Sequence, residues 1–156
     1  MIGGVCKIRK NTTRYKANTL RFYAPAGESI IDFKESSMRE SVCEFLEEIR
    51  EKNSEVSILM VLDNFTSHRA KMTQEKAGDL DIRLVYLPPY SPDLNLIDQI
   101  WRGLKRWIST AFFNTREGFL KIIEQAYNQL SWKISYTEGW IQKFLPEQPK
   151  QFYPIL

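Results

Sequence analysis

Two aspartates, Asp63 and Asp98, stand where the sequence could bring carboxylates together for chemistry. Asp63 follows a nearly unbroken apolar run over residues 56–62, which is typical of a buried strand. Asp98 lies in the first turns of a helix predicted over residues 93–110. Sites collect at the carboxyl ends of strands in open α/β sheets, so Asp63 is well placed to hold a cation. Two facing carboxylates could hold Mg²⁺ or Mn²⁺ and activate water or a hydroxyl for phosphodiester transfer.

Each aspartate also has an ordinary structural interpretation. The Asp63 carboxylate could accept amides near Thr66 or Ser67 and so cap the following turn. Asp98 could form a surface ion pair with Arg102, four residues later, worth roughly 0.2–0.5 kcal/mol. If Asp63 is considered alone, the capping interpretation is favoured over a metal site. The second carboxylate on a later helix shifts the balance toward a shared metal site.

Polar residues near the two aspartates could support such a site. Asn64 could position a metal-bound water or turn the chain. His68, the only histidine, could orient the site or have a surface or packing role. Three basic residues follow on the predicted helix: Arg102, Lys105 and Arg106. They could bind phosphates beside the site, or they could form a solvated face.

The elements that must position these residues alternate between strands and helices. Runs typical of strands occupy residues 2–8, 20–23, 30–33, 56–62 and 83–87. Helical periodicity of apolar residues covers 38–52, 67–80, 93–110, a helix opening at Thr115, and 136–145. This order predicts an α/β layered domain in which the 56–62 strand is covered on both faces.

Composition limits the class of protein. With 156 residues, of which 43% are hydrophobic, the chain can form one domain with a real core. No run approaches the length of a membrane span, and no signal peptide precedes the chain, so we expect a cytoplasmic protein. Cys6 and Cys43 lack metal-ligand spacing and are expected to be free thiols. The net charge of +3 does not by itself indicate a nucleic-acid binder.

The segments around the two aspartates resemble a known family. They are Val61–Asn64, His68, Leu87–Asn95, Ile97-Asp98, Trp101 and Lys105. Together they resemble the mariner superfamily of DNA transposases, most closely its bacterial and archaeal insertion-sequence members with a DDE superfamily endonuclease domain. Thirty-four residues separate Asp63 from Asp98, which is similar to the mariner spacing. The resemblance is dense over residues 59–106 and continues through the remainder.

This resemblance implies a ribonuclease H-like fold, a mixed sheet flanked by helices. It implies that Asp63 and Asp98 are the second and third catalytic acids and bind Mg²⁺ or Mn²⁺. It also implies DNA as the partner, at transposon ends and at the target, with no membrane involved. Arg102, Lys105 and Arg106 would then contact DNA, with Asn64 and His68 in support.

Two departures from the family pattern stand out. Insertion-sequence members usually have proline at the position of Leu96 and glutamate at that of Asp98. The family's first acid lies on a first strand upstream of the strand that residues 2–8 resemble, and no acid precedes Glu28 here. We therefore expect residues 1–156 to form one N-terminally incomplete catalytic domain, with a proline-punctuated tail at 146–156. Asp32 is a weaker candidate to replace the first acid.

Three functions compete at this point. The first is a metal-dependent DNA transposase domain, and the second is a non-catalytic remnant or partner subunit that binds DNA or another transposase chain. An ordinary ribonuclease H or junction-resolving nuclease is the third, and the proline-aromatic loop at 87–95 argues against it. Because a missing central strand would expose sheet edges, we expect a homo-oligomer, most simply a dimer.

Overall fold

The computed structural model describes residues 15–36, 38–89, 91–133 and 135–144. The predicted strand over 2–8, Cys6 and the tail at 146–156 lie outside these residues. In chain order the elements are β1 (Asn18–Phe22), β2 (Ile30–Lys34), α1 (Arg39–Lys52), β3 (Ile58–Leu62), α2 (Lys71–Asp79), β4 (Ile82–Tyr86), the 3₁₀ helix η1 (Pro92–Leu94), α3 (Leu96–Thr110), α4 (Arg116–Ser131) and α5 (Ser135–Phe144). The mixed α/β class is as expected from the sequence.

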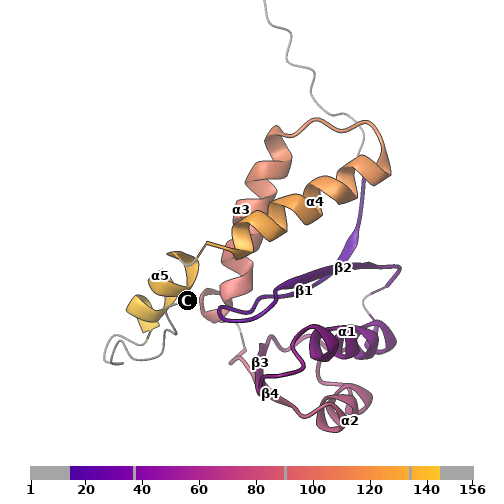
Figure 1. Cartoon of the computed structure of the whole chain (residues 1–156), viewed down its shortest axis with the longest axis vertical. Helices are drawn as coiled ribbons and strands as arrows, with labels where there is room; N and C mark the ends of the chain where they lie inside the picture. Colours follow the sequence, from indigo (N-terminus) through magenta and orange to yellow (C-terminus); the bar gives the residue numbers. More distant parts are fainter. Residues whose placement is uncertain (1–14, 37, 90, 134, 145–156) are drawn as a thin grey trace, which may run out of the picture.

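The described strands form two separate pairs. β1 and β2 make an antiparallel hairpin in which Leu20 is opposite Asp32, and β3 and β4 are parallel with Ile58 opposite Ile82. In Figure 1 the hairpin lies between α3 and α4 on one side and α1 on the other, while β3, β4 and α2 lie on the α1 side. The sheet expected from the sequence is therefore divided in two among the described residues.

One hydrophobic core joins both strand pairs through α1. The predicted apolar face of this helix is buried and includes Phe45, Leu46 and Ile49. Ile58 and Met60 of β3 pack in the same core, and partly buried residues of β1 reach it from the other strand pair. α1 is therefore the element that holds the hairpin and the β3–β4 pair in a fixed relation.

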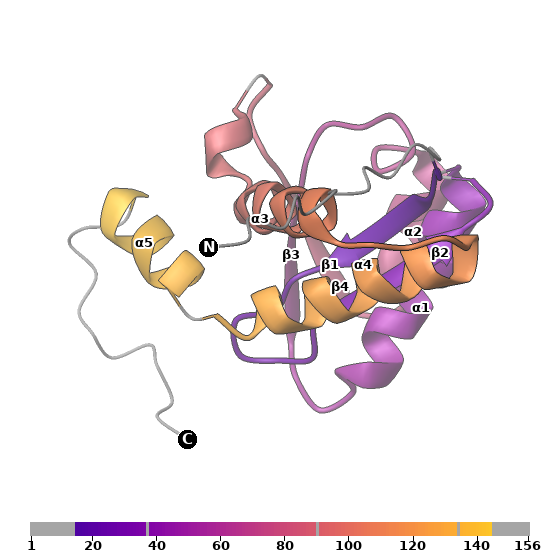
Figure 2. The same ribbon diagram turned by 90° about the horizontal axis from the view of Figure 1, so that it is seen from above.

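A second core lies between α3, α4 and the outer face of the hairpin. Its buried members are Ile100, Leu104, Ile123, Ala126, Tyr127 and Leu130. The Tyr127 hydroxyl donates a hydrogen bond to the Phe22 carbonyl, at 2.8 Å, which ties α4 to β1. A Cβ atom at Gly103 would lie 2.8 Å from the Tyr136 hydroxyl, so glycine allows this close approach to α3. Viewed from above, α4 runs over the hairpin and α5 stands to one side (Figure 2).

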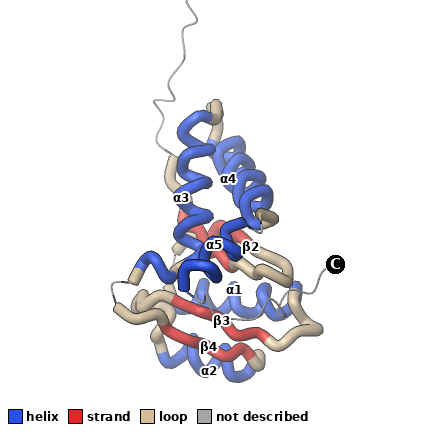
Figure 3. The backbone as a smooth tube through the Cα atoms, turned by 90° about the vertical axis from the view of Figure 1, so that its left-hand side faces the viewer, coloured by secondary structure: helices blue, strands red, loops and turns tan. Residues whose placement is uncertain are grey.

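The expectation that the 56–62 strand is covered on both faces is wrong. Leu59 is 59% exposed and Val61 is 52% exposed, whereas the alternate residues Ile58 and Met60 are buried. Figure 3 shows β3 and β4 side by side, with α3 and α4 above them rather than over their outer face. The reason is that α3 and α4 bury their apolar residues against the hairpin instead.

The helix starts agree with the sequence for α4 and differ from it for α2 and α3. α4 begins where predicted, and its N-cap Thr115 accepts a hydrogen bond from the Gly118 amide at 3.0 Å. The helix predicted over 67–80 is shorter, because residues 65–69 form a turn in which the His68 amide donates to the Phe65 carbonyl. The helix predicted from Asp93 is divided into η1 and α3 at Asn95.

Arg50 on α1 holds the connections around β3 and β4. Its guanidinium donates hydrogen bonds of 2.8 Å to the carbonyls of Leu80, Asp81 and Val56. Arg50→Met should lower the free energy of unfolding by about 2 kcal/mol, because charged donors to backbone carbonyls are lost. Urea unfolding followed by circular dichroism measures this. Lys52→Met, on the same helix, should change stability by less than about 0.5 kcal/mol, and equal losses would contradict the role of Arg50.

Candidate active site at the end of the parallel strands

Asp63 and Asn64 directly follow β3, at the end where β3 and β4 both finish. The hydrogen bonding between the two strands continues one residue beyond β4, since the Leu87 amide donates to the Leu62 carbonyl at 2.8 Å. The Asn64 side-chain amide donates to the Leu87 carbonyl, so Asn64 holds the start of the proline-rich loop against the strand end. Asn64 therefore has a structural role, and its supporting role in chemistry stays a prediction.

The Asp63 carboxylate is fixed by two donors in the following turn. Its Oδ1 atom lies 2.7 Å from His68 Nδ1 and accepts the Phe65 amide at 3.1 Å. These hydrogen bonds, led by that from His68, hold the pKa of Asp63 below its ordinary value of 3.8, against the opposing effect of burial. The His68 backbone carbonyl in turn accepts from the Tyr86 hydroxyl at 2.9 Å. The capping interpretation is therefore correct in part, with Phe65 as the donor.

Asp98 lies in the first turn of α3 and shares its surroundings with Asp63. Both aspartates line a groove of about 530 Å³, and both line a smaller cleft of about 240 Å³ beside the proline-rich loop. Arg102 lies 3.9 Å from Asp93, and no ion pair between Asp98 and Arg102 occurs in the described part of the chain. The fold thus places the two aspartates that the sequence singled out along the same groove and the same cleft.

Arg21, in the middle of β1, is a site residue that sequence reasoning did not assign. Its guanidinium lies 4.1 Å from the centre of the Trp101 ring, and its Nη1 atom is buried without a hydrogen-bond partner in the described residues. Burial lowers the pKa of Arg21, while Asp98, Tyr127 and Asp63 oppose that shift, in that order. The one feature of the sequence that could have identified Arg21 is that it is a lone charge inside the β-prone run 20–23.

The predicted DNA-contacting residues share one exposed part of α3. Arg102, Lys105 and Arg106 are all exposed. Lys105 Nζ lies 5.9 Å from the centre of the Trp101 ring, the same ring that Arg21 approaches. The Trp101 ring is thus approached by a partly buried cation from β1, which also lines the groove, and by an exposed cation on its own helix.

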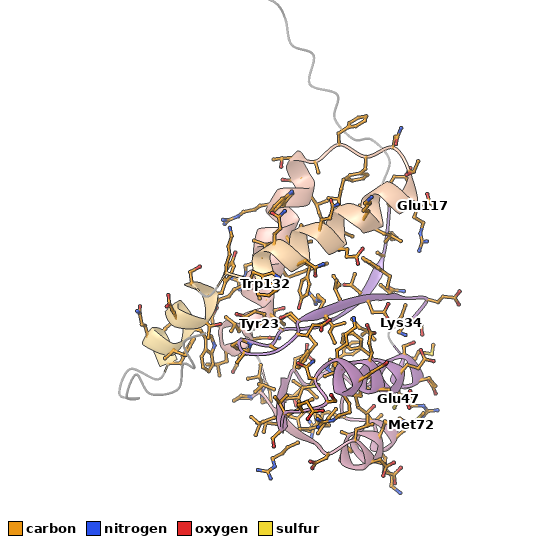
Figure 4. The ribbon with its side chains drawn as sticks, viewed as in Figure 1. Tyr23, Lys34, Glu47, Met72, Glu117 and Trp132 are labelled. Atoms are coloured by element: carbon orange, nitrogen blue, oxygen red, sulfur yellow. The ribbon has the colours of Figure 1, made fainter. Side chains whose placement is uncertain are left out.

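Asp32 is not brought to this site. Its carboxylate lies 2.9 Å from Lys34 Nζ, and Lys34 also contacts Glu44 of α1. Asp32 therefore points to the α1 side of the hairpin, whereas its neighbours Ile31 and Phe33 pack on the α3–α4 side. Figure 4 labels Lys34 beside α1. The suggestion that Asp32 replaces a missing first acid is not supported by its position.

Among the described residues that line the groove, the acidic side chains are two, those of Asp63 and Asp98. Across residues 15–36, 38–89, 91–133 and 135–144, no cluster of three or more histidine, cysteine, aspartate or glutamate side chains could hold a metal. Mg²⁺ is often held by one or two carboxylates together with waters and phosphate oxygens. Asp63 and Asp98 therefore fit a weakly held Mg²⁺ or Mn²⁺ that needs substrate phosphate to complete its ligands.

His68→Phe should raise the pKa of Asp63 toward 3.8, because the ring keeps its shape and loses the donor. In the wild type, the stabilisation from this contact is present above about pH 3.8 and is lost as pH falls through the lower folded pKa. Carbon-detected NMR titration of the Asp63 carboxyl measures the change. An unaltered pKa in the variant would show that His68 is not the cause.

These features define a class of protein: an α/β domain with one carboxylate at a strand end and a second on the helix beside it. The model of the DDE superfamily endonuclease family matches residues 2–119, and the chain belongs to that family. No curated protein matches the chain. Among the described residues, no helix is both long and apolar enough to span a membrane.

Proposed function

We propose that the chain is the catalytic domain of a DNA transposase that cleaves and transfers DNA strands at transposon ends. Membership of the DDE superfamily endonuclease family supports this class. The observation that carries the proposal is that Asp63 and Asp98, from separate elements, line the same groove and the same cleft. The mariner superfamily, with its insertion-sequence members and ribonuclease H-like fold, is the narrower assignment that the segments at 61–64 and 87–98 favour.

In this proposal each residue has a defined role. Asp63 and Asp98 hold Mg²⁺ or Mn²⁺, which supplies activation of water or a 3′-hydroxyl and stabilises the leaving oxygen. His68 keeps the Asp63 carboxylate ionised and oriented through its 2.7 Å contact. The exposed cations of α3 bind the DNA backbone by charge: Arg102, Lys105 and Arg106.

A second candidate is a non-catalytic subunit that binds DNA or another transposase chain. The two-carboxylate donor set favours it, since a site with few charged ligands holds a divalent ion weakly. The two candidates share the basic part of α3 and differ in whether the carboxylates take part in cleavage.

Incubation with supercoiled plasmid DNA separates the candidates. A transposase domain should convert the plasmid to open circles with Mn²⁺ or Mg²⁺ and should not do so with EDTA. DNA binding measured in parallel by fluorescence anisotropy serves as the control for folded, binding-competent protein. Retained binding with no metal-dependent nicking would reject the catalytic proposal and favour the non-catalytic subunit.

We also propose that the chain forms a homo-oligomer, most simply a dimer. Exposed apolar side chains on the outer face of the β3–β4 pair support this: Leu59, Val61 and Val85. Light scattering coupled to size exclusion should give twice the chain mass of 18.4 kDa. A single-chain mass at all accessible concentrations would reject the dimer.

A further inference from the structure

Phe65 is an exposed aromatic side chain directly beside the candidate site. It follows Asp63 by two residues, and 52% of it is exposed. Single exposed apolar residues are common on protein surfaces and need no explanation. Phe65 differs because its backbone amide donates to Asp63 Oδ1 at 3.1 Å, which fixes this residue relative to the carboxylate. A group stacked on the Phe65 ring therefore lies next to the candidate metal ligands.

The turn that carries Phe65 is held at both of its ends. The Phe65 carbonyl accepts the His68 amide at 3.0 Å and the Arg69 amide at 3.3 Å. The His68 carbonyl accepts the Tyr86 hydroxyl of β4 at 2.9 Å. The rings of Phe65 and His68 meet at a tilt of 67° with their centres 5.7 Å apart, and the same His68 ring contacts Asp63. The Phe65 ring is thus positioned before any substrate arrives, which lowers the ordering cost of binding.

Arg69 places a positive charge on the same turn. The hydrogen bond from its amide to the Phe65 carbonyl closes a turn of helical size, in which side chains four residues apart lie on the same side. Arg69 Nη1 donates to the Asn64 side-chain oxygen at 3.4 Å, and its guanidinium carbon lies 5.8 Å from the centre of the Tyr86 ring. That oxygen is neutral, so the contact does not neutralise the charge of the exposed guanidinium. An aromatic ring and a cation are therefore combined beside Asp63.

An unpaired DNA base is the group that fits this combination. Proteins that bind unpaired nucleotides combine aromatic rings, on which the bases stack, with cations that contact the backbone. A base inside a duplex is already stacked between its neighbours, so it must leave the duplex to stack on a protein side chain. Steps along a duplex strand are about 3.4 Å, which places a base at the Phe65 ring within about two or three nucleotides of a phosphate at Asp63.

We propose that Phe65 stacks on one unpaired base beside the cleaved phosphodiester and that Arg69 binds the phosphate of that nucleotide. The domain then favours DNA in which the base pairs next to the cleavage point are open over DNA that is fully paired. This inference rests on the proposed function, because the carboxylates must hold the DNA phosphate for the ring to reach a base. It assigns substrate contacts to two residues outside the carboxylate pair and the basic part of α3.

Two duplexes of about 20 base pairs test the proposal, one fully paired and one with mismatched pairs at one end. At that end one base is 2-aminopurine, whose fluorescence falls when it stacks, and a dye at the other end reports binding by anisotropy. Ca²⁺ is present as a hard cation that takes oxygen ligands. The wild type should bind the open duplex with a Kd at least about fivefold lower, the lower end of what stacking of one base contributes. The 2-aminopurine fluorescence of the open duplex should fall on binding.

Matched variants assign the effect to the ring. Phe65→Leu should bring the two Kd values within about twofold and abolish the fall in fluorescence, with binding of the paired duplex kept, whereas Phe65→Trp should retain the preference. Phe112→Leu is the matched control and should also retain it, because Phe112 is 64% exposed but lies beyond the end of α3 that is distant from Asp98. Arg69→Met should weaken binding of the open duplex and lower the slope of log Kd against log salt by about one.

The outcomes separate this inference from the proposed function. Equal Kd values for the two duplexes in the wild type, or an unchanged preference in Phe65→Leu, would overturn the stacking role while DNA binding stands. A loss of preference in Phe112→Leu as large as that in Phe65→Leu would also overturn it, because exposed aromatic surface in general would then be the cause. Failure of the wild type to bind either duplex would reject DNA as the partner, and with it both the proposed function and this inference.

Discussion

Asp63→Asn and Asp98→Asn should each lower the rate of plasmid nicking in Mn²⁺ by about 100-fold or more, the loss seen when one group that stabilises a transition state is removed. The substitution keeps side-chain size and removes the charge that would hold the cation. Both residues line the groove and the smaller cleft, so either loss breaks the same site. The rate of open-circle formation at saturating Mn²⁺ is the measurement.

Asp93→Asn is the matched control for this pair. Asp93 lies in η1, close in sequence to Asp98, but it is exposed and lines neither the groove nor the cleft. Its change to asparagine should leave the nicking rate within about twofold, as expected for an exposed charge at the surface. Equal losses in all three variants would mean that general surface charge, and not a shared carboxylate site, controls cleavage.

Leu104→Ala should lower the free energy of unfolding by about 2–5 kcal/mol, the range for removal of a fully buried leucine side chain. Leu104 is 0% exposed and lies at the centre of the α3–α4 core that fixes Asp98. Urea unfolding followed by fluorescence of the tryptophans gives the value. Asp98 lies in the same helix, so the loss should also loosen the site.

Leu59→Ala provides the matched substitution on β3. Leu59 is 59% exposed in a single chain, so its truncation should change the free energy of unfolding by no more than about 0.5 kcal/mol at concentrations where light scattering gives the single-chain mass. A loss as large as that of Leu104→Ala would mean that the outer face of β3 is covered in solution. That result would restore the expectation from the sequence that this strand is buried on both faces.

Periodicity was sufficient to place the helices that have their own amphipathic face. The apolar positions of α1 and α4 recur every three or four residues, so their buried residues could be read directly from the chain. The two aspartates could also be singled out from the sequence, because one directly follows an apolar run and the other lies in the first turns of a predicted helix. In the structure both residues line a common groove, and their roles as a shared metal site and in catalysis stay predictions.

Features that depend on partners far apart in the chain could not be predicted in this way. An apolar run such as 58–62 looks the same whether helices cover one face of the strand or both. The position of Arg21 depends on α3 bringing Trp101 to β1, across about half of the sequence. The shorter α2 follows from hydrogen bonds of the 65–69 turn to Asp63 and Tyr86, which periodicity does not record.

The location of a bound Mn²⁺ ion tests the central claim most directly. A crystal of the chain soaked in Mn²⁺, with data collected at a wavelength that gives anomalous scattering, shows the position of the ion. We predict one site within about 2.5 Å of a carboxylate oxygen from both Asp63 and Asp98. Mn²⁺ bound to only one of the two, or only at other acids of the surface, would contradict a shared two-carboxylate site.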